Sequence, residues 1–342
     1  LNPVFSKAQA DGDDILFTSS NETTKLSHEI ETFSTSTPAL WAWVKIPTLS
    51  HTTDTVIYLY YGNATAASQQ NATDVWSNGY VSTYHLKDAT TSTTNDSLGT
   101  NNGTKTAANQ PLEAVGKIGK AQQFDDTYDY IRKTGFSGGT NVYTISAWVN
   151  PTVVVGINPN IVSSDSNNPM LRGIESTISI FAGARQDTSL SFTTGSWQYI
   201  TWTHNASNEI IYKNTTAASY ASTGGVADWT NTNIGSWNSI LTSWNGFIDE
   251  VRISSVARSA DWIATEYANQ NSPETFYNIG SEVQKDNYTV PSMPAGWYSA
   301  AWGKRQLVTF DHTKVPNTNQ TDFPTLIKLT DVSNDLWANA QA

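Results

Sequence analysis

The 342-residue sequence contains no cysteine. This absence excludes disulfide bonds, thiolate metal sites and cysteine nucleophiles. Positive charge is also scarce, because 19 Lys and Arg stand against 30 Asp and Glu and leave a formal net charge of −11. Such a surface is poorly suited to neutralise phosphates or anionic lipid headgroups, so nucleic acids are not expected partners.

Long apolar runs are missing as well. No stretch of the sequence approaches the roughly 18 consecutive apolar residues that a membrane-spanning helix needs. The first residues also lack the charged and apolar regions of a secretory signal. We expect no membrane span in this segment, and the acidic, Lys-poor composition favours an extracellular or cell-surface location.

The plentiful residue types favour β-structure. Aromatic residues make up 11% of the chain, with 13 Trp and 15 Tyr, whereas charged residues reach only 14% against a usual ~25%. Thr, Val, Ile and aromatic side chains fit the pleated surface of a sheet, while helix faces favour Glu, Lys, Ala and Leu. We therefore predict an all-β protein.

Strand-like runs recur at intervals of roughly ten residues through the middle of the chain, for example at 143–149, 197–202 and 247–253. This spacing predicts a large β-sandwich, followed by one helix at 259–269. Further strand runs near both ends predict a smaller sandwich. The expected segments are the C-terminal half of a small sandwich at 1–65, a linker at 66–75, the large sandwich at 76–282, a linker at 283–296 and the N-terminal half of the next small sandwich at 297–342.

The two ends of the chain resemble each other. Residues 1–10 (LNPVFSKAQA) align with residues 333–342 (SNDLWANAQA), which repeat Asn2, Ala8, Gln9 and Ala10 as Asn334, Ala340, Gln341 and Ala342 and replace Val4 and Phe5 conservatively by Leu336 and Trp337. A match of this kind predicts an internal repeat. The chain would then be one period of a tandem array, or a subunit whose ends are complementary halves of one domain.

Several motifs of the central block occur together in one family. They are Tyr84-His-Leu-Lys-Asp88, Gly116-Lys-Ile-Gly-Lys-Ala-Gln-Gln-Phe124, Ile145-Ser-Ala-Trp-Val149, Gly195-Ser-Trp197 and Gly246-Phe-Ile-Asp-Glu-Val-Arg-Ile253. Through them the block resembles the laminin-G-like, concanavalin A-type jelly roll of lectins and glucanases. The resemblance implies a two-sheet jelly-roll sandwich.

The flanks resemble a domain of unknown function that often accompanies lectin-like modules in bacterial and archaeal surface proteins. The opening of that domain is similar to Trp302-Gly-Lys-Arg305 with Asp322-Phe-Pro-Thr-Leu-Ile327, and its later half is similar to residues 10–63. The halves stand here in swapped order. The expected fold class is all-β, with a central concanavalin A-like jelly roll plus a smaller β-sandwich split between the N- and C-terminal ends.

A glycosidase of this fold needs two carboxylates that flank one bond. The related glucanases carry them as Glu-x-Asp-x-x-Glu, and this triplet is absent from the sequence. The adjacent pairs Asp125-Asp126 and Asp249-Glu250 would point to opposite faces of a strand. The five histidines show no metal-ligand spacing. We do not expect an enzyme.

Asp249 is the candidate metal ligand. It shares strand parity with Phe247, Val251 and Ile253, so its carboxylate is predicted to enter the core, where an unpaired charge is costly. The resemblance implies structural Ca²⁺, because similar last-strand aspartates bind calcium in related jelly rolls. Loop carbonyls and, more weakly, Asp126 would complete the site. The alternatives are capture by backbone N–H groups or a bulge that turns Asp249 outward.

Tryptophans and asparagines are interleaved in the turn-rich stretch 229–245. Exposed aromatic faces beside amide and carboxylate groups are the usual parts of a sugar-binding surface. The candidate carbohydrate-binding residues are Trp229, Trp237, Trp244 and Asn245, with Asn231, Asn233 and Asn238 between them. The alternative is that these tryptophans close one end of the sandwich.

Nine Asn-x-Ser/Thr sequons occur, close to the number that the Asn, Ser and Thr content produces by chance, so they are weak evidence for glycosylation. The possible N-glycosylation sites are Asn21, Asn63, Asn71, Asn95, Asn102, Asn205, Asn214, Asn287 and Asn319.

The leading function predicted from the sequence is a structural repeat or subunit of an extracellular filament or stalk. Either end alone leaves sheet edges unpaired and an apolar face uncovered. The complement comes from the next repeat, from a neighbouring subunit by strand addition, or from the same chain folding back, and the first two join copies of the chain head to tail. The expected interface residues are Ile15, Phe17, Trp41, Trp43, Leu307, Phe310, Leu326, Leu329 and Trp337.

The alternative function is a carbohydrate-binding adhesin module, in which glycans are the partners and polymerisation is incidental. Filaments without glycan affinity favour the first function. Glycan binding that depends on the exposed tryptophans favours the second.

Overall fold

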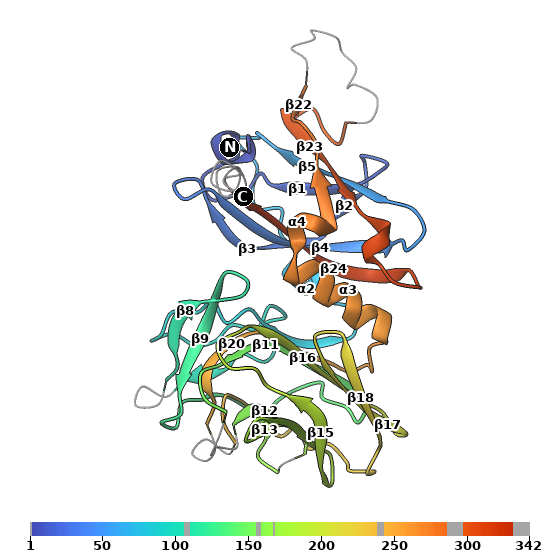
Figure 1. Cartoon of the computed structure of the whole chain (residues 1–342). Coiled ribbons are helices and arrows are strands. Elements are labelled where there is room, and N and C mark those ends of the chain that lie inside the picture. The colour runs from blue at the N-terminus through green and yellow to red at the C-terminus, as the bar shows by residue number, and fades with distance from the viewer. Residues whose placement is uncertain are drawn as a thin grey trace, which may run out of the picture. The chain divides into compact units, whose positions relative to one another are not determined.

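The computed structural model describes residues 2–105, 110–154, 159–166, 168–237, 243–285 and 297–330. Two compact units divide the chain: a smaller unit made of Leu1–Asn78 with Ala264–Ala342, and a jelly-roll unit made of Gly79–Ile263. Each is built from antiparallel strands (Figure 1). None of the described helices is long and apolar enough to cross a membrane.

The jelly-roll unit consists of two sheets. Its strands are β6 (Tyr80–Tyr84), β7 (Thr104–Lys105), β8 (Leu112–Val115), β9 (Lys120–Asp125), β10 (Ile131–Thr134), β11 (Tyr143–Pro151), β12 (Asn160–Ser164), β13 (Met170–Ile174), β14 (Thr177–Phe181), β15 (Arg185–Ser191), β16 (Gln198–His204), β17 (Asn208–Lys213), β18 (Thr216–Ala221), β19 (Asn231–Ile234) and β20 (Asn245–Ser254). The seven-stranded sheet has the order β15-β14-β13-β12-β19-β10-β7. The eight-stranded sheet has the order β18-β17-β16-β11-β20-β9-β8, with β6 also paired to β20.

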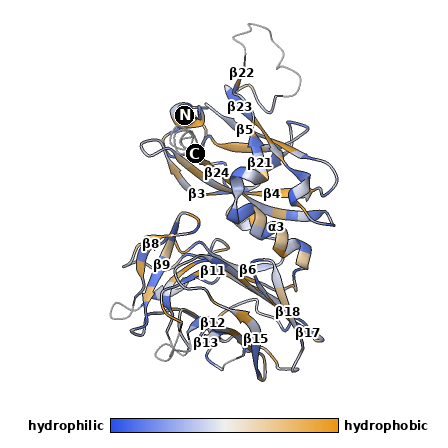
Figure 2. Ribbon diagram, viewed as in Figure 1, coloured by the Kyte–Doolittle hydropathy of each residue, from blue (hydrophilic) through white to orange (hydrophobic). Residues whose placement is uncertain are grey.

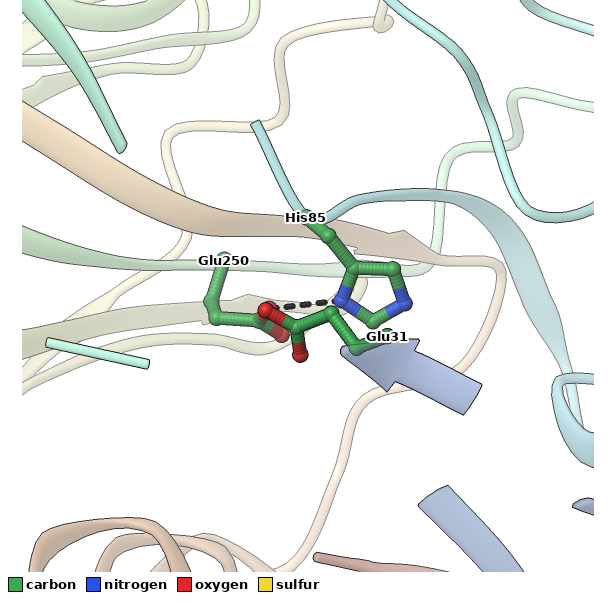
Figure 3. A group of neighbouring side chains, drawn as sticks. All are labelled: Glu31, His85 and Glu250. Atoms are coloured by element: carbon green, nitrogen blue, oxygen red, sulfur yellow. Dashed lines mark hydrogen bonds and ion pairs between the residues drawn. The ribbon is translucent and has the colours of Figure 1, made fainter. Parts of the chain in front are cut away.

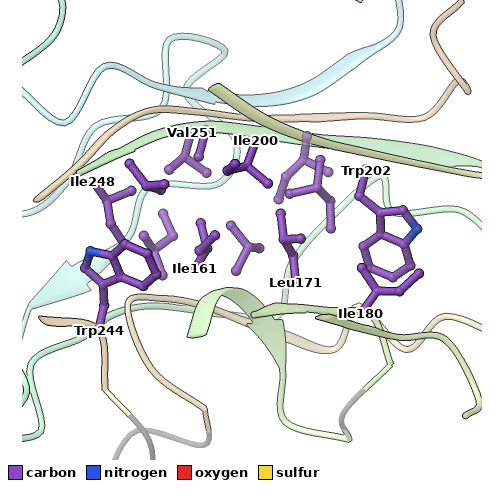
Figure 4. Packing of buried hydrophobic residues seen from close by; sticks show 14 of the residues in the cluster. Ile161, Leu171, Ile180, Ile200, Trp202, Trp244, Ile248 and Val251 are labelled. Carbon is purple, nitrogen blue, oxygen red and sulfur yellow. The ribbon is translucent and has the colours of Figure 1, made fainter. Parts of the chain in front are cut away.

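The core of the jelly-roll unit lies between these sheets. Leu171 and Ile180 of the seven-stranded sheet face Ile200, Trp202 and Val251 of the eight-stranded sheet (Figure 4). Each of these side chains is fully buried. Burial of one large apolar side chain stabilises a fold by roughly 1.5–3 kcal/mol, so this cluster holds the two sheets together. Many strands alternate between hydrophobic and hydrophilic residues, as a sheet with one solvated face requires (Figure 2).

The first and last strands of the jelly-roll unit are neighbours. β6 pairs with β20, with Tyr80 opposite Ser254. The Ser255 N–H donates to the Gly79 carbonyl at 2.8 Å. Residues at the two limits of the unit are therefore hydrogen-bonded to each other.

The smaller unit takes its strands from both ends of the chain. The N-terminal part supplies β1 (Leu16–Ser19), β2 (Lys25–Leu26), β3 (His28–Ser34), β4 (Ala39–Leu49) and β5 (Thr55–Tyr61), and the C-terminal part supplies β21 (Tyr277–Ile279), β22 (Val283–Gln284), β23 (Lys304–Phe310) and β24 (Gln320–Thr330). One sheet has the order β2-β1-β5-β23-β21, with β22 also on β23, and the other has the order β24-β4-β3. The helices are α1 (Val4–Lys7), α2 (Ala72–Val75), α3 (Ala260–Asn271), α4 (Pro273–Phe276) and the 3₁₀ helix η1 (His312–Lys314).

The two ends complete each other within one chain. β23 pairs with β5 from Lys304–Tyr61 to Phe310–Thr55. β24 pairs with β4 along its whole length, and β4 also pairs with β3. Of the three sources left open for the complement of each terminal half, the described residues show the same chain, so the assignment of 297–330 to the next small sandwich is wrong. Intrachain pairing costs only the closure of a connection, whereas a second copy would lose roughly 4–15 kcal/mol of translational and rotational freedom.

The predicted interface residues belong mostly to the core of the smaller unit. Trp41 and Leu307 are half-buried. Trp337 lies outside the described residues. The remaining six are buried: Ile15, Phe17, Trp43, Phe310, Leu326 and Leu329.

The unit boundaries differ from those expected. Trp76, expected to open the large sandwich, is fully buried in the smaller unit and donates its indole N–H to Glu29 at 2.7 Å. Part of the expected linker at 66–75 is helix α2, capped by the Asn71 side chain. Residues 264–282 also belong to the smaller unit. The predicted helix at 259–269 is confirmed as α3.

Side chains block the free edge of β24. The Asn269 amide donates to the Leu326 carbonyl at 3.0 Å and accepts from the Leu326 N–H at 2.7 Å. The Tyr277 hydroxyl donates to the Lys328 carbonyl at 2.7 Å and accepts from the Lys328 N–H at 2.6 Å. An edge strand whose backbone groups are already paired is a poor template for another strand.

We expect Asn269→Ala to destabilise the smaller unit and to open this edge. The Leu326 N–H and C=O would lose their partner in a buried environment, at roughly 1–3 kcal/mol for each group left unpaired. Hydrogen exchange at the Leu326 amide and chemical denaturation measure the effect. Asn271→Ala, at an exposed position of the same helix, is the control and should change stability by less than ~0.5 kcal/mol. Unchanged exchange at Leu326 in Asn269→Ala would contradict the edge-capping role.

Candidate functional site

The structure separates the three candidate tryptophans. Trp229 and Trp244 are buried, with 7% and 0% exposure, whereas Trp237 is half-buried. Trp229 stacks on Phe136 at a centroid distance of 5.4 Å and meets Tyr143 edge-on at 5.3 Å. Both buried tryptophans belong to the core cluster of the jelly-roll unit, so the prediction that they bind carbohydrate is wrong.

The surroundings of the two buried tryptophans explain why they cannot turn outward. Gly139 lies so close to the Trp229 indole that a Cβ at this position would come within 2.1 Å of the ring. Trp244 packs edge-on against Phe192 at 5.5 Å. Asn245, the fourth candidate, is half-buried at the start of β20, and its carbonyl accepts from the Thr152 N–H at 2.9 Å.

Trp237 joins a polar network centred on Asp165. The network, called the Asp165 cluster below, consists of Arg132, Asp165, Asn231, Asn233 and Trp237. Arg132 forms an ion pair with Asp165, with one Nη1–Oδ1 distance of 3.0 Å. The Asn231 and Asn233 amides donate to the same carboxylate at 2.8 and 2.9 Å. The Trp237 indole N–H donates to the Asp165 backbone carbonyl at 3.3 Å.

Strand register brings the cluster together. Arg132 on β10 is opposite Asn233 on β19, and their neighbours Ile131 and Ile234 belong to the core cluster. Because side chains alternate along a strand, Arg132 and Asn233 point away from that core. Asp165 follows the last residue of β12, which also pairs with β19. The cluster therefore lies on the outer side of the seven-stranded sheet.

The cluster holds its carboxylate in the charged form. Burial acts to raise the pKa of Asp165, but hydrogen bonds from Asn233, Arg132 and Asn231 and the positive charge of Arg132 outweigh it, so this pKa lies below its usual value. The Asp165 and Arg132 side chains remain 26% and 22% exposed. The carboxylate is thus ionised, fixed in position and accessible to a ligand.

Sequence reasoning found only part of this cluster. It placed Trp237, Asn231 and Asn233 together and missed Arg132 and Asp165. These two lie 33 residues apart, and Arg132 lies 101 residues from Asn233. The spacing of Asn231 and Asn233 was a usable signal, because residues two apart in a strand place their side chains on the same face.

The candidate metal ligands are not brought together. Asp249 is fully buried, and its Oδ2 accepts from the Ile118 N–H at 2.9 Å. Capture by backbone N–H groups, one of the alternatives open at the sequence level, is thus observed. Asp126 is exposed, and its neighbour Asp125 pairs with Asn245, four residues or roughly 13 Å along β20 from Asp249.

Ca²⁺ ligands lie within about 2.3–2.6 Å of the ion, so Asp126 and Asp249 do not share one. The Gly116–Gly119 turn further encloses Asp249, because a Cβ on Gly116 would come within 2.6 Å of its carboxylate oxygen. Structural calcium at Asp249 stays a prediction.

A buried ion network lies beside Asp249 on β20. The Glu250 carboxylate is hydrogen-bonded to His85 Nδ1 at 2.6 Å (Figure 3). It also accepts from Arg252 at 2.6 Å. Burial acts to raise the pKa of Glu250, but the charges of His85 and Arg252 outweigh it and lower this pKa. All three side chains are at most 3% exposed, so the network offers no substrate access.

A polar pocket of about 240 Å³ lies in the smaller unit and is lined by described residues that include Asp54, Glu274, Tyr277 and Asp311. Ligand atoms of Asp54, Asp311 and His312 lie within 4.8 Å of one another. His312 Nδ1 contacts Asp54 at 2.6 Å, and Asp311 caps η1 by accepting from the Thr313 N–H at 2.9 Å. These contacts show that Asp54, Asp311 and His312 lie together because they cap η1.

The sequons fall into different environments. Asn63 is buried, and Asn205 and Asn214 are half-buried. Asn287 lies outside the described residues. The remaining five are exposed: Asn21, Asn71, Asn95, Asn102 and Asn319. Glycosylation of the exposed group stays a prediction.

Comparison with known families agrees with the expected resemblance. Residues 125–264 match the model of the concanavalin A-like lectin/glucanases superfamily, and residues 11–107 match a domain of unknown function, DUF2341. The chain thus contains a concanavalin A-like jelly roll and a segment of the DUF2341 type. That Trp302–Ile327 is the opening half of the second domain stays a prediction. No curated protein matches the chain.

Several solved structures of low sequence identity are similar to part of this chain. Domain 4 of AbnA, an extracellular GH43 arabinanase from Geobacillus stearothermophilus in complex with arabinotriose, is 19% identical over 54% of this chain and 96% of that domain, with a TM-score of 0.42. The receptor-binding domain of botulinum neurotoxin type G is 12% identical over 56% of this chain, with a TM-score of 0.45. The binding domain of Paraclostridial Mosquitocidal Protein 1 is 16% identical over 64%, with a TM-score of 0.46. The chain spans about half the length of the two toxin domains, 51% and 57%.

We expect Arg132→Gln to raise the pKa of Asp165, because it removes the positive charge and part of the hydrogen bonding that lower this pKa. Carboxyl NMR titration measures the change. A lowered pKa of Asp165 stabilises the folded protein above the ordinary Asp pKa of ~3.9, and this stabilisation is lost as the pH falls through the pKa of Asp165 in the folded state. The Arg132→Gln variant has less of this stabilisation, so it should lose less stability in acid than the wild type. Arg185→Gln, which removes the partner of Asp187 on the same sheet, is the control and should leave Asp165 unchanged. A pKa of Asp165 that is equal in wild type and Arg132→Gln would refute the assignment.

Proposed function

We propose that the chain is a carbohydrate-binding module of an extracellular or cell-surface protein and that the Asp165 cluster is its glycan surface. One observation carries the proposal: a carboxylate, two amides, a guanidinium and an indole edge gather on the outer face of a concanavalin A-like sheet. These are the groups with which proteins bind polyhydroxylated ligands.

The hydrogen-bonding capacity of the cluster supports this function. A guanidinium carries five N–H donors. Arg132 directs Nη1 and Nη2 at Asp165, and Nη1 also lies 3.3 Å from the side-chain amide oxygen Oδ1 of Asn233. The Asp165 carboxylate has about four acceptor sites, and Arg132, Asn231 and Asn233 already donate four hydrogen bonds to it. Ligand hydroxyls would therefore accept from the remaining N–H groups of Arg132 and Asn231. Because Arg132 is already neutralised by Asp165 and the chain carries a net charge of −11, the proposed ligand is a neutral glycan.

Binding without catalysis is the proposed activity of the cluster. Hydrolysis of a glycosidic bond uses two carboxylates that flank that bond. Asp165 is the single carboxylate of the cluster, and its donors lower its pKa and so remove the proton that a general acid would need.

Trp237→Ala should weaken glycan binding by roughly tenfold or more, about 1.4 kcal/mol, because it removes the aromatic surface of the cluster. Glycan-array screening followed by calorimetry with neutral oligosaccharides measures the effect. The matched control is Trp197→Ala, which removes another half-buried tryptophan, one that packs on Phe247 of β20 at 6.2 Å. Absence of any glycan ligand, or equal losses in the two variants, would remove the support for the proposal.

A second function is favoured by the similarity of the chain ends. We propose that copies of the chain also assemble head to tail, as repeats or subunits of an extracellular filament. Since β23 and β24 are paired within their own chain, this assembly does not use them for strand exchange. The repeated terminal segment is then the part available for contact between copies.

Electron microscopy and light scattering on the full chain test this second function. We expect end-to-end oligomers whose mean length grows with protein concentration, because a head-to-tail contact does not close on itself without a rotation that makes a ring. A monodisperse monomer from micromolar to millimolar concentration would exclude it, whatever the outcome of the glycan measurements.

A further inference from the structure

The N-terminal segment is held on the smaller unit by a small set of anchors. Val4 and Phe5 are 0% and 3% exposed, and Phe5 stacks on Phe33 at a centroid distance of 6.3 Å. The Gln9 amide donates to the carbonyls of Asn63 and Ala66 at 2.8 and 2.9 Å.

Two local contacts shape the same segment. The Asn2 side chain accepts from the Val4 N–H at 3.0 Å. The backbone N–H of Gln9 donates to Asp14 at 2.8 Å. Because this contact uses the backbone, it is independent of the side chain at position 9.

The C-terminal segment 333–342 keeps the side chains that make these contacts. In the alignment Asn334 and Gln341 are identical to Asn2 and Gln9, and the buried pair Val4-Phe5 has the apolar counterparts Leu336-Trp337. The positions that change without conserving chemistry include Ser6 and Lys7, both exposed in α1. The match is thus concentrated at the anchors, as expected if both segments bind the same surface.

The contact that the C-terminal segment lacks is weak. Lys7 pairs with Glu282 at 2.5 Å, and the corresponding residue is Asn339. The Lys7 side chain is 36% exposed, and exposed pairs of this type contribute little to binding.

Other differences favour the C-terminal segment as a ligand. Leu336 and Trp337 carry more apolar surface than Val4 and Phe5, and this surface adds affinity once the residues around the buried pair repack to admit the larger side chains. At the position of Pro3, the N-cap of α1, the segment has Asp335, a preferred N-cap residue. Ala338 replaces Ser6 and has the higher helix propensity.

We propose that the surface covered by residues 2–9 is a docking site for residues 333–342 of a second copy of this chain. Its floor includes Phe33, the carbonyls of Asn63 and Ala66, and Asp14. Each copy then has one site and two segments that fit it, so the resident segment is exchanged for the stronger one of a neighbour. This inference rests on the second proposed function and names its contact; it is independent of glycan binding.

A labelled synthetic peptide of residues 331–342 (DVSNDLWANAQA) tests recognition by fluorescence anisotropy on the full chain. Phe5→Ala weakens the resident segment, so this variant should bind the peptide at least roughly tenfold more tightly than the wild type. Gln9→Ala is a second variant that weakens the resident segment, and it leaves the buried residues Val4 and Phe5 unchanged. The control peptide carries Trp337→Ala and Gln341→Ala. No saturable binding to either variant, or equal binding of the control peptide, would overturn the proposal.

Cross-linking tests whether a second copy supplies the segment. Because the chain lacks cysteine, two single-cysteine variants can be mixed: Ala67→Cys, beside the Ala66 carbonyl that accepts from Gln9, and Ala340→Cys, at the counterpart of Ala8. A bismaleimide should yield a dimer that the unlabelled peptide abolishes. Thr194→Cys, at an exposed position of the jelly-roll unit, replaces Ala340→Cys in the control and should yield none.

The cross-linking result separates the two forms of exchange. A chain carrying both Ala67→Cys and Ala340→Cys that links only to itself, with no dimer from the mixed variants, would overturn docking between copies. Specific dimers without filaments would instead contradict the filament function and leave the docking site standing.

Discussion

Backbone pairing between the two ends of the chain holds the smaller unit together. β5 and β4 of the N-terminal part form ladders with β23 and β24 of the C-terminal part, and each pairing buries apolar residues that neither part covers alone. Asn269 and Tyr277 then occupy the backbone groups on the outer edge of β24. Once these contacts form, a neighbouring chain finds no vacant strand position there. The proposed contact between copies would therefore use a different element, and the helical segment at residues 2–9 is attached by few side chains.

Periodicity and composition predicted the fold class well, because alternating apolar positions and turn residues are local properties of the sequence. They did not identify the partner of each terminal half. A strand pattern shows that an edge needs a neighbour, and it is the same whether that neighbour lies in the same chain or in another. The predicted unit boundaries were wrong for a related reason. Trp76 stands in polar, turn-rich sequence, and its indole is hydrogen-bonded to Glu29, 47 residues away.

The candidate site shows the same limit at the level of single side chains. Trp229, Trp237 and Trp244 have similar sequence surroundings, yet packing against Phe136, Tyr143 and Phe192 buries two of them. The partners of the carboxylates were equally hard to identify from the sequence. One oxygen of the buried Asp249 carboxylate accepts from a main-chain N–H, a donor that every residue type except proline supplies. Asp165 and Arg132 gave no local signal because their pairing depends on the register of three strands.

The adjacency of Tyr80 and Ser254 has a consequence for the architecture of related proteins. A module whose entry and exit strands are hydrogen-bonded neighbours needs only a narrow gap in its host, so it can be inserted into a surface loop without forcing the flanking strands apart. The host in this chain is the sandwich formed by the termini. Replacement of residues 80–254 by a short turn, or by a different module with equally close ends, would keep the host strands in register. Exchange of this kind would replace the inserted module and leave the host sandwich unchanged.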